Sequence, residues 1–368
     1  MVKQKKGVSA LGVPVYLVLL VLVASTVSLV GCSVGAGAER PSPSRRTAMP
    51  SVSTPTSAST SIPEATLTPT TDAKPTPEVS PSPTASAAEG PTDVPSDPVS
   101  SQASAPLPCP YLTGRTEIGV LESQKISERV RYLVHLPPCY DQYPDKAFPV
   151  LYLLHGWPLD EWHWMDLGVD ALSDDWISRG LVGPFIVVLP GADSNGHYVN
   201  SSGGADSFEG FVVDELVPHI DRSYRTWATP EGRAIGGISR GGVWALEIAF
   251  RHPELFGAVG GHSPALTLNR PLPQYDPYLL AQSGLASVRI YLDAGDADWA
   301  RAGAIKLRDL LIEAGVDVVY QVHEGGHVDS LWRGGLPDYL EFYTATWPPR
   351  YDGLPRWEDV SRGAVSIP

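Results

Sequence analysis

The stretch AIGGISRGG, residues 234–242, places one serine, Ser239, among four glycines. Glycine loses more backbone entropy on folding than any other residue, so a glycine cluster indicates a sharp turn or a close approach of another segment. Residues 233–238 form a short, largely apolar run that suits a buried strand. Residues 243–250 carry apolar side chains at helical spacing. Ser239 is therefore predicted at a sharp strand-to-helix turn.

The segments around this turn predict alternating strands and helices. Residues 116–121 and 129–136 alternate apolar and polar side chains, which predicts an antiparallel pair. The runs 150–154 and 185–189 are continuously apolar, as in parallel strands covered on both faces. We therefore expect an α/β fold with a mostly parallel central sheet, an antiparallel N-terminal strand pair and helices on both faces. The remaining predictions are helices at 208–222, 243–252, 304–314 and 331–346, and strands at 289–293 and 316–322.

Composition divides the 368 residues into regions. Residues 109–350 hold every tryptophan before the C-terminal tail and have the size of one large α/β domain. Residues 33–108 are rich in Ser, Thr and Pro, with no aromatic residue from 41 onward, so they cannot bury enough apolar surface to fold and are expected to be a disordered linker. Residues 351–368 are assigned to a C-terminal tail. The net charge of −14 argues against a nucleic-acid partner.

The N-terminus has the pattern of a targeting signal. Three lysines precede an apolar run at residues 8–30, and the run ends in Leu-Val-Gly-Cys32. This ending resembles the lipobox of bacterial lipoproteins, which implies a signal peptide at residues 1–32 and a lipid anchor on Cys32. The domain would then lie in the bacterial cell envelope, outside the cytoplasm and attached to the membrane. A retained transmembrane anchor and an ordinary cleaved signal peptide are alternatives that also export the domain.

Two cysteines remain for the folded domain. Cys109 and Cys139 both lie early in it, and export favours a disulfide between them, with two buried free thiols as the alternative. No pair of histidines stands at metal-ligand spacing beside them. We therefore expect no metal and no cofactor. The oligomeric state stays open.

Ser239 lies at the centre of a G-x-S-x-G pattern at a strand-to-helix turn, which is the context of a nucleophile elbow. A serine hydroxyl needs a neighbouring base to act as a nucleophile. Two histidines follow the strand 316–322, and His327, on the loop after two glycines, is favoured over His323, which stays close to the strand. Ser239 and His327 are the predicted nucleophile and base.

A carboxylate must orient the base, and two donors must stabilise the oxyanion. Asp296 and Asp298 both occupy the turn after the strand 289–293, and the pattern alone does not choose between them. The backbone N–H of Arg240 and of Trp157 are the predicted oxyanion donors, and His155 is expected to position the loop that carries Trp157. Four residues are predicted to contact substrate at the mouth of the site: Trp157, Tyr198, Asn200 and Trp332.

Four stretches together resemble the esterase family of α/β-hydrolases, which includes esterase D, enterochelin esterases, feruloyl esterases and mycolyltransferases. They are FPVLYLLHGW, FEGFVVDELVPHIDRSYRT, RAIGGISRGGVWALEIAFRHPELFGAVGGHS and GGHVDSLW, and the resemblance covers nearly all of residues 109–350. It implies that the acid is Asp298, with Asp296 as runner-up. It also supports the nucleophile, base and oxyanion assignments.

The resemblance implies a serine esterase that works through an acyl-enzyme on a small-molecule, carbohydrate or lipid ester. An acyltransferase with the same triad and a sugar or lipid acceptor is the nearest alternative. A non-catalytic surface binding protein on a hydrolase scaffold is the alternative from another class. Arg240 stands where many members carry an apolar residue, and its cation is expected to favour an anionic or polar substrate.

Overall fold

The computed structural model describes residues 109–192, 195–198, 203–268, 271–282, 285 and 287–360. Cys32, the predicted signal peptide, the predicted linker and Asn200 lie outside these residues, as does the end of the predicted tail.

Eight strands form one sheet in the order β1-β2-β4-β3-β5-β6-β7-β8. β1 pairs antiparallel with β2, and β2 pairs antiparallel with β4. All remaining neighbours are parallel. The predicted α/β fold with an antiparallel N-terminal pair is thus confirmed. The strands are β1 Arg115–Glu122, β2 Arg129–Leu136, β3 Val150–Leu154, β4 Ile186–Pro190, β5 Arg233–Ile238, β6 Ala258–His262, β7 Arg289–Gly295 and β8 Val318–His323.

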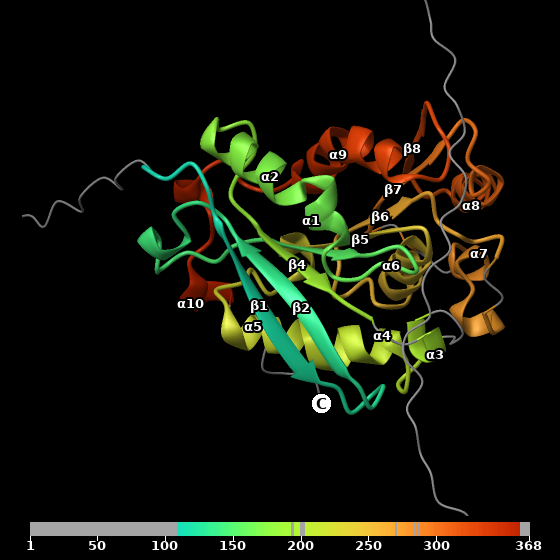
Figure 1. Cartoon of the computed structure of the whole chain (residues 1–368), viewed down its shortest axis with the longest axis horizontal. Helices are drawn as coiled ribbons and strands as arrows, with labels where there is room; N and C mark the ends of the chain where they lie inside the picture. Colours follow the sequence, from blue (N-terminus) through green and yellow to red (C-terminus); the bar gives the residue numbers. More distant parts are fainter. Residues whose placement is uncertain are drawn as a thin grey trace, which may run out of the picture. The chain divides into compact units, whose positions relative to one another are not determined.

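Helices lie on both sides of the sheet (Figure 1). α1, α2 and α9 cover one face, and α4, α5, α6 and α8 cover the other. The helices of the described residues are α1 His163–Leu167, α2 Val169–Ser178, α3 Asn195–Tyr198, α4 Phe208–Gly210, α5 Val217–Ser223, α6 Arg240–Arg251, α7 Pro277–Leu280, α8 Arg301–Glu313, α9 Asp329–Thr344 and α10 Trp357–Val360.

The continuous apolar runs serve two separate cores. In β3, Val150, Tyr152 and Leu154 pack into the core with α4, α5, α6 and α8. Leu151 and Leu153 pack into the core with α1, α2 and α9. Because successive side chains of a strand point to opposite faces, a strand covered on both sides needs apolar residues at every position.

The structure differs from the predicted elements at several places. The predicted helix 208–222 contains a π-helical segment, Phe211–Leu216, between α4 and α5. Pro218 follows this segment and has no N–H for a bond to the carbonyl four residues earlier, so the regular ladder is interrupted there. The helices that were not predicted are α1, α2, α3, α7 and α10. Strand β6 was also missed, because its sequence, AVGGH, contains two glycines, which disfavour strands.

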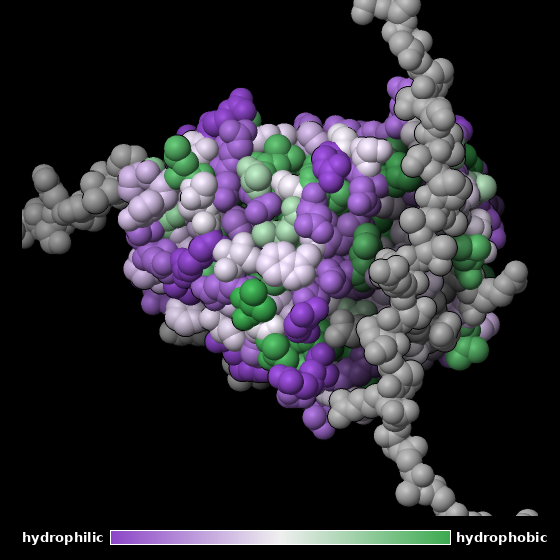
Figure 2. Space-filling view, viewed as in Figure 1, coloured by the Kyte–Doolittle hydropathy of each residue, from purple (hydrophilic) through white to green (hydrophobic). Residues whose placement is uncertain are grey.

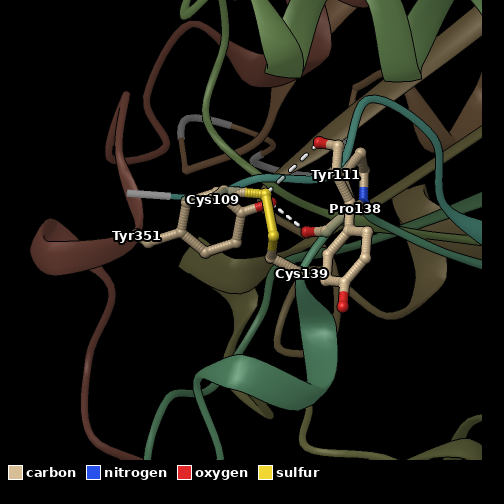
Figure 3. The surroundings of a disulfide bond; sticks show 5 residues. All are labelled: Cys109, Tyr111, Pro138, Cys139 and Tyr351. Carbon is tan, nitrogen blue, oxygen red and sulfur yellow. Dashed lines mark hydrogen bonds between the residues drawn. A yellow bond between two sulfur atoms is a disulfide. The ribbon is translucent and has the colours of Figure 1, made fainter. Parts of the chain in front are cut away.

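A disulfide joins Cys109 to Cys139, which excludes the free-thiol alternative (Figure 3). Tyr351 lies against it and donates its hydroxyl hydrogen bond to the carbonyl of Pro138. Leu354 is 3% exposed, and Lys146 donates to its carbonyl oxygen at 2.9 Å. Residues 351–360, assigned above to a tail, therefore pack against the domain.

The surface of the described domain is mixed. On the face shown in Figure 2, hydrophobic residues occur in small groups separated by hydrophilic ones. Among the residues that the structure describes, no helix is both long and apolar enough to span a bilayer.

We predict that replacing both Cys109 and Cys139 by serine lowers the free energy of unfolding by about 3–4 kcal/mol, because the bond closes a loop with a sequence separation of 30 residues. Thermal and denaturant unfolding of wild type and double variant measure the difference. Reductant should destabilise the wild type and leave the double variant unchanged. Equal stability of the two proteins would contradict the prediction.

Candidate active site at the carboxyl ends of the strands

The turn between β5 and α6 explains the glycine cluster. Ser239 has φ 55° and ψ −113°. Residues other than glycine rarely adopt such a positive φ. A Cβ on Gly237 would lie 2.3 Å from the carbonyl carbon of Gly241. A Cβ on Gly241 would lie 2.4 Å from the carbonyl oxygen of Leu154, at the end of β3. Both glycines are therefore needed for the turn to close against its neighbours.

Three predicted residues meet at this turn. His327 Nε2 lies 2.8 Å from Ser239 Oγ, and His327 Nδ1 lies 2.9 and 3.1 Å from the two carboxylate oxygens of Asp298. The carboxylate accepts a hydrogen bond from the Nδ1–H, so Nε2 is left to accept a hydrogen bond from the hydroxyl. Ser239 follows β5, Asp298 follows β7, and His327 follows β8.

Asp298 is held by more than the imidazole. Its Oδ1 accepts a hydrogen bond from the N–H of Ala300 at 2.7 Å, and the hydroxyl of Ser263 also bonds to the carboxylate. Burial opposes ionisation, but the hydrogen bonds from His327, Ser263 and Ala300 outweigh it and lower the pKa of Asp298. The carboxylate is thus ready to stabilise an imidazolium.

Two tryptophans enclose the imidazole of His327. The ring of Trp299 lies 4.3 Å from it between centroids, and the ring of Trp332 lies 5.0 Å away in an edge-on arrangement. Trp332 donates to Ser263 Oγ at 3.1 Å, and Ser263 in turn bonds to Asp298. The orientation of the imidazole is therefore fixed by packing as well as by its hydrogen bonds.

The alternatives for base and acid have other partners in this arrangement. Nε2 of His323 lies 3.4 Å from Oδ2 of Asp293, a fully buried carboxylate. Asp296 accepts a hydrogen bond from the N–H of Gly325 at 2.9 Å and so holds the loop that leads to His327.

In the loop after β3, residues 155–159, hydrogen bonds hold the peptide groups. The carbonyl oxygen of Gly156 accepts from the N–H of Leu159 at 2.9 Å and lies 3.0 Å from His155 Nδ1. In a trans peptide the C=O and the following N–H point in opposite directions, so these bonds also set the direction of the N–H of Trp157. Arg240 is the first residue of α6, and its N–H is among the donors that a helix leaves without intrahelical partners.

Two side-chain predictions need correction. Tyr198 is 1% exposed and donates its hydroxyl to the carbonyl of His155 at 2.6 Å, so it lies beneath the 155–159 loop and not at the mouth. Arg240 is 7% exposed, and its Nε donates to the carbonyl of Tyr198 at 2.6 Å. Burial lowers the pKa of its guanidinium. The expected attraction of an anionic substrate by this cation is therefore wrong, because the cation is buried in the protein.

A pocket of about 560 Å³ opens over Ser239 and His327. Its walls are mainly apolar and include Trp157 and Trp332, two of the predicted substrate contacts. Asp329 is the one acidic residue of its described lining, which contains no lysine or arginine. Four further lining residues are Leu159, His163, Val328 and Ser330.

The sequence analysis missed three residues of this region. Ser263 follows a strand whose weak pattern hid it, and no motif marks His163 or Asp329. His163 comes eight residues after His155 and was not singled out among the nine histidines. Its burial and partners are visible only in the folded chain.

The amino-acid sequence matches a known protein family. The sequence model of the family described as "Putative esterase" matches residues 123–343. An endo-1,4-beta-xylanase/feruloyl esterase of Xylanibacter ruminicola is 38% identical over 133 residues, which are 34% of this chain and 18% of that protein. The iron(III) salmochelin esterase of Escherichia coli is 30% identical over 192 residues, 48% of this chain and 46% of that protein. The chain thus spans less than half the length of these two relatives.

Solved structures share the fold. A ferulic acid esterase matches with a TM-score of 0.58 and 27% identity, over 64% of this chain and 99% of that chain. An S-formylglutathione hydrolase of Staphylococcus aureus matches with a TM-score of 0.55 and 16% identity, over 63% of this chain and 99% of that chain. The predicted α/β-hydrolase fold is confirmed.

We predict that Gly241→Ala lowers stability by at least about 2 kcal/mol, because the new methyl group would press against the carbonyl oxygens of Leu154 and His155. Gly334→Ala in α9 is the matched control, since a Cβ there meets nothing within 4 Å. That change should raise stability by about 0.5–1 kcal/mol. Urea unfolding of both variants tests the pair, and a Gly241→Ala protein as stable as the control would contradict the account of the turn.

Proposed function

The chain belongs to the esterase family whose sequence model it matches, and from that premise we propose that it hydrolyses carboxylic esters through an acyl-enzyme on Ser239. The observation that carries the proposal is the continuous hydrogen-bonded series from Ser239 through His327 to Asp298. The series has the donor and acceptor order that a serine nucleophile requires.

In the proposed reaction, Ser239 Oγ attacks the ester carbonyl carbon while its proton passes to His327 Nε2. The backbone N–H groups of Trp157 and Arg240 donate hydrogen bonds to the oxyanion. Asp298 stabilises the imidazolium that forms. The C–O bond to the alcohol then breaks, and the alcohol takes the proton from His327. Water repeats the sequence on the acyl-enzyme and releases the acid.

The pocket supports esters with an uncharged apolar or aromatic acyl group. Its walls carry the rings of Trp157 and Trp332, and Trp157 is 52% exposed. Relatives named as feruloyl and ferulic acid esterases are consistent with an aromatic acyl group. Asp329 adds a negative charge to a lining that has no described cation, so it disfavours anionic groups.

We predict that Ser239→Ala and His327→Ala each lower kcat for 4-nitrophenyl esters by roughly 1,000-fold or more, because each removes a member of one catalytic unit. Asp298→Asn should lower kcat by roughly 100-fold or more, since it no longer stabilises the imidazolium. Asp296→Asn is the matched control and should cost much less. Initial rates on residues 105–368 measure all four variants. Wild-type rates in Ser239→Ala, or no turnover of any ester by the wild type, would refute the proposal.

We also predict that 4-nitrophenyl benzoate is cleaved with a kcat/KM roughly fivefold above that of the 4-carboxybenzoate ester at low salt. The repulsion comes from Asp329, which is half-exposed, so 0.5 M NaCl should narrow the preference. The intrinsic hydrolysis rates of the two esters are the reference. A preference for the carboxylate ester would show that cations absent from the described lining dominate the site.

A further inference from the structure

The residue that lies between the two loops of the site is His163, the first residue of α1. Its side chain is 1% exposed, yet it lines the pocket over Ser239. The N–H of Gly156 donates to its Nδ1 at 3.2 Å. Nδ1 is therefore an acceptor, so the ring proton is on Nε2, which lies 3.3 Å from Oδ1 of Asp329.

This contact completes the restraint of the 155–159 loop. The peptide group between His155 and Gly156 is held at its oxygen by Tyr198 and at its nitrogen by His163. The next peptide group, which carries the N–H of Trp157, is held at the oxygen of Gly156. Without His163, the nitrogen end of the first peptide loses the partner described here. The loop then keeps only the hydrogen bonds at its carbonyl oxygens, so the Trp157 N–H is fixed less closely.

The other nitrogen of His163 reaches the segment that carries the base. Asp329 begins α9 and comes two residues after His327. A carboxylate in the first turn of a helix is favoured by the helix dipole, so Asp329 is a stable acceptor. Trp332, which packs edge-on against His327, also packs edge-on against His163 with the centroids 5.9 Å apart.

We propose that His163 is a positioning residue that orients the Trp157 N–H for the oxyanion and couples it, through Asp329, to the segment bearing His327. The proposal rests on the proposed ester hydrolysis. His163 makes no bond to the substrate. It acts by keeping the oxyanion donor and the base at a fixed position and orientation relative to each other.

The charge state of His163 decides whether this contact exists. Burial lowers the pKa of its imidazole, and this effect outweighs the hydrogen bond and negative charge of Asp329 and the charges of Asp166 on α1 and Asp160 before it. The ring is therefore neutral at neutral pH. A proton on Nδ1 would face the N–H of Gly156, donor against donor, and break the contact as the pH falls.

Two variants separate the contact from simple packing. His163→Asn can place its Oδ1 near the position of Nδ1 and keeps an acceptor for Gly156, whereas His163→Phe keeps an aromatic ring and removes the acceptor. We expect His163→Phe to lower kcat for 4-nitrophenyl benzoate by roughly 10- to 100-fold, with KM little changed, because the oxyanion donor is misplaced. His163→Asn should recover most of this loss. Melting temperatures of both variants are measured alongside.

The pH profile gives a readout that packing alone would not move. In the wild type, protonation of His163 breaks the contact and adds a loss of roughly 10- to 100-fold, so the acid limb of log kcat/KM against pH should be steeper than a slope of 1 over the range in which His163 gains its proton. In His163→Asn the slope should be limited to 1. Tryptophan fluorescence at each pH confirms that the protein stays folded over the range compared.

Equal kcat in wild type and His163→Phe would overturn the proposal, and so would His163→Asn no better than His163→Phe or an acid slope unchanged in His163→Asn. These results leave ester hydrolysis itself intact, since that fails only if wild type lacks turnover or Ser239→Ala keeps it. The two failures are therefore distinguishable.

Discussion

The close approach of α6 to the end of β3 is the constraint on which the rest of the site depends. Gly241 has no Cβ, so the first turn of α6 lies against the carbonyl oxygens of Leu154 and His155. The nucleophile turn and the 155–159 loop are thereby brought to one place. Any larger residue at Gly241 would separate them. Ser239 accepts an unfavourable backbone conformation because strand pairing on one side and the helix on the other over-determine it.

The parallel strands supply the remaining groups from one edge of the sheet. Because β5, β6, β7 and β8 are consecutive neighbours, the residues that follow them are also neighbours. Ser239, Ser263, Asp298 and His327 each follow one of these strands, and hydrogen bonds link all four. The site therefore lies along the ends of neighbouring strands. The first residues of α9 and the 155–159 loop line the pocket above it.

The sequence predicted what depends on local pattern. Ser239 and the fold followed from glycine spacing and apolar periodicity, and His327 followed from its place on a glycine loop. The choice of Asp298 needed the family resemblance, since Asp296 fits the same turn. Side-chain directions could not be predicted, because Tyr198 and Arg240 are turned inward by partners far along the chain. His163 and Ser263 carry no motif, and only the tertiary fold brings them to the site.

Two buried aspartates, Asp293 within β7 and Asp298 after it, have different roles because their surroundings differ. Asp293 pairs with His262 at 3.1 Å and accepts the hydroxyl of Tyr339 at 2.6 Å, so its oxygens are occupied in the core. The hydroxyl of Tyr343, which bonds to His262, fits into this core because Gly236 and Gly260 have no Cβ. A Cβ at either position would collide with that hydroxyl. Asp298 lies past the strand end, where the imidazole of His327 can reach it. Five residues along the chain thus separate a carboxylate that supports the fold from one that can orient a base.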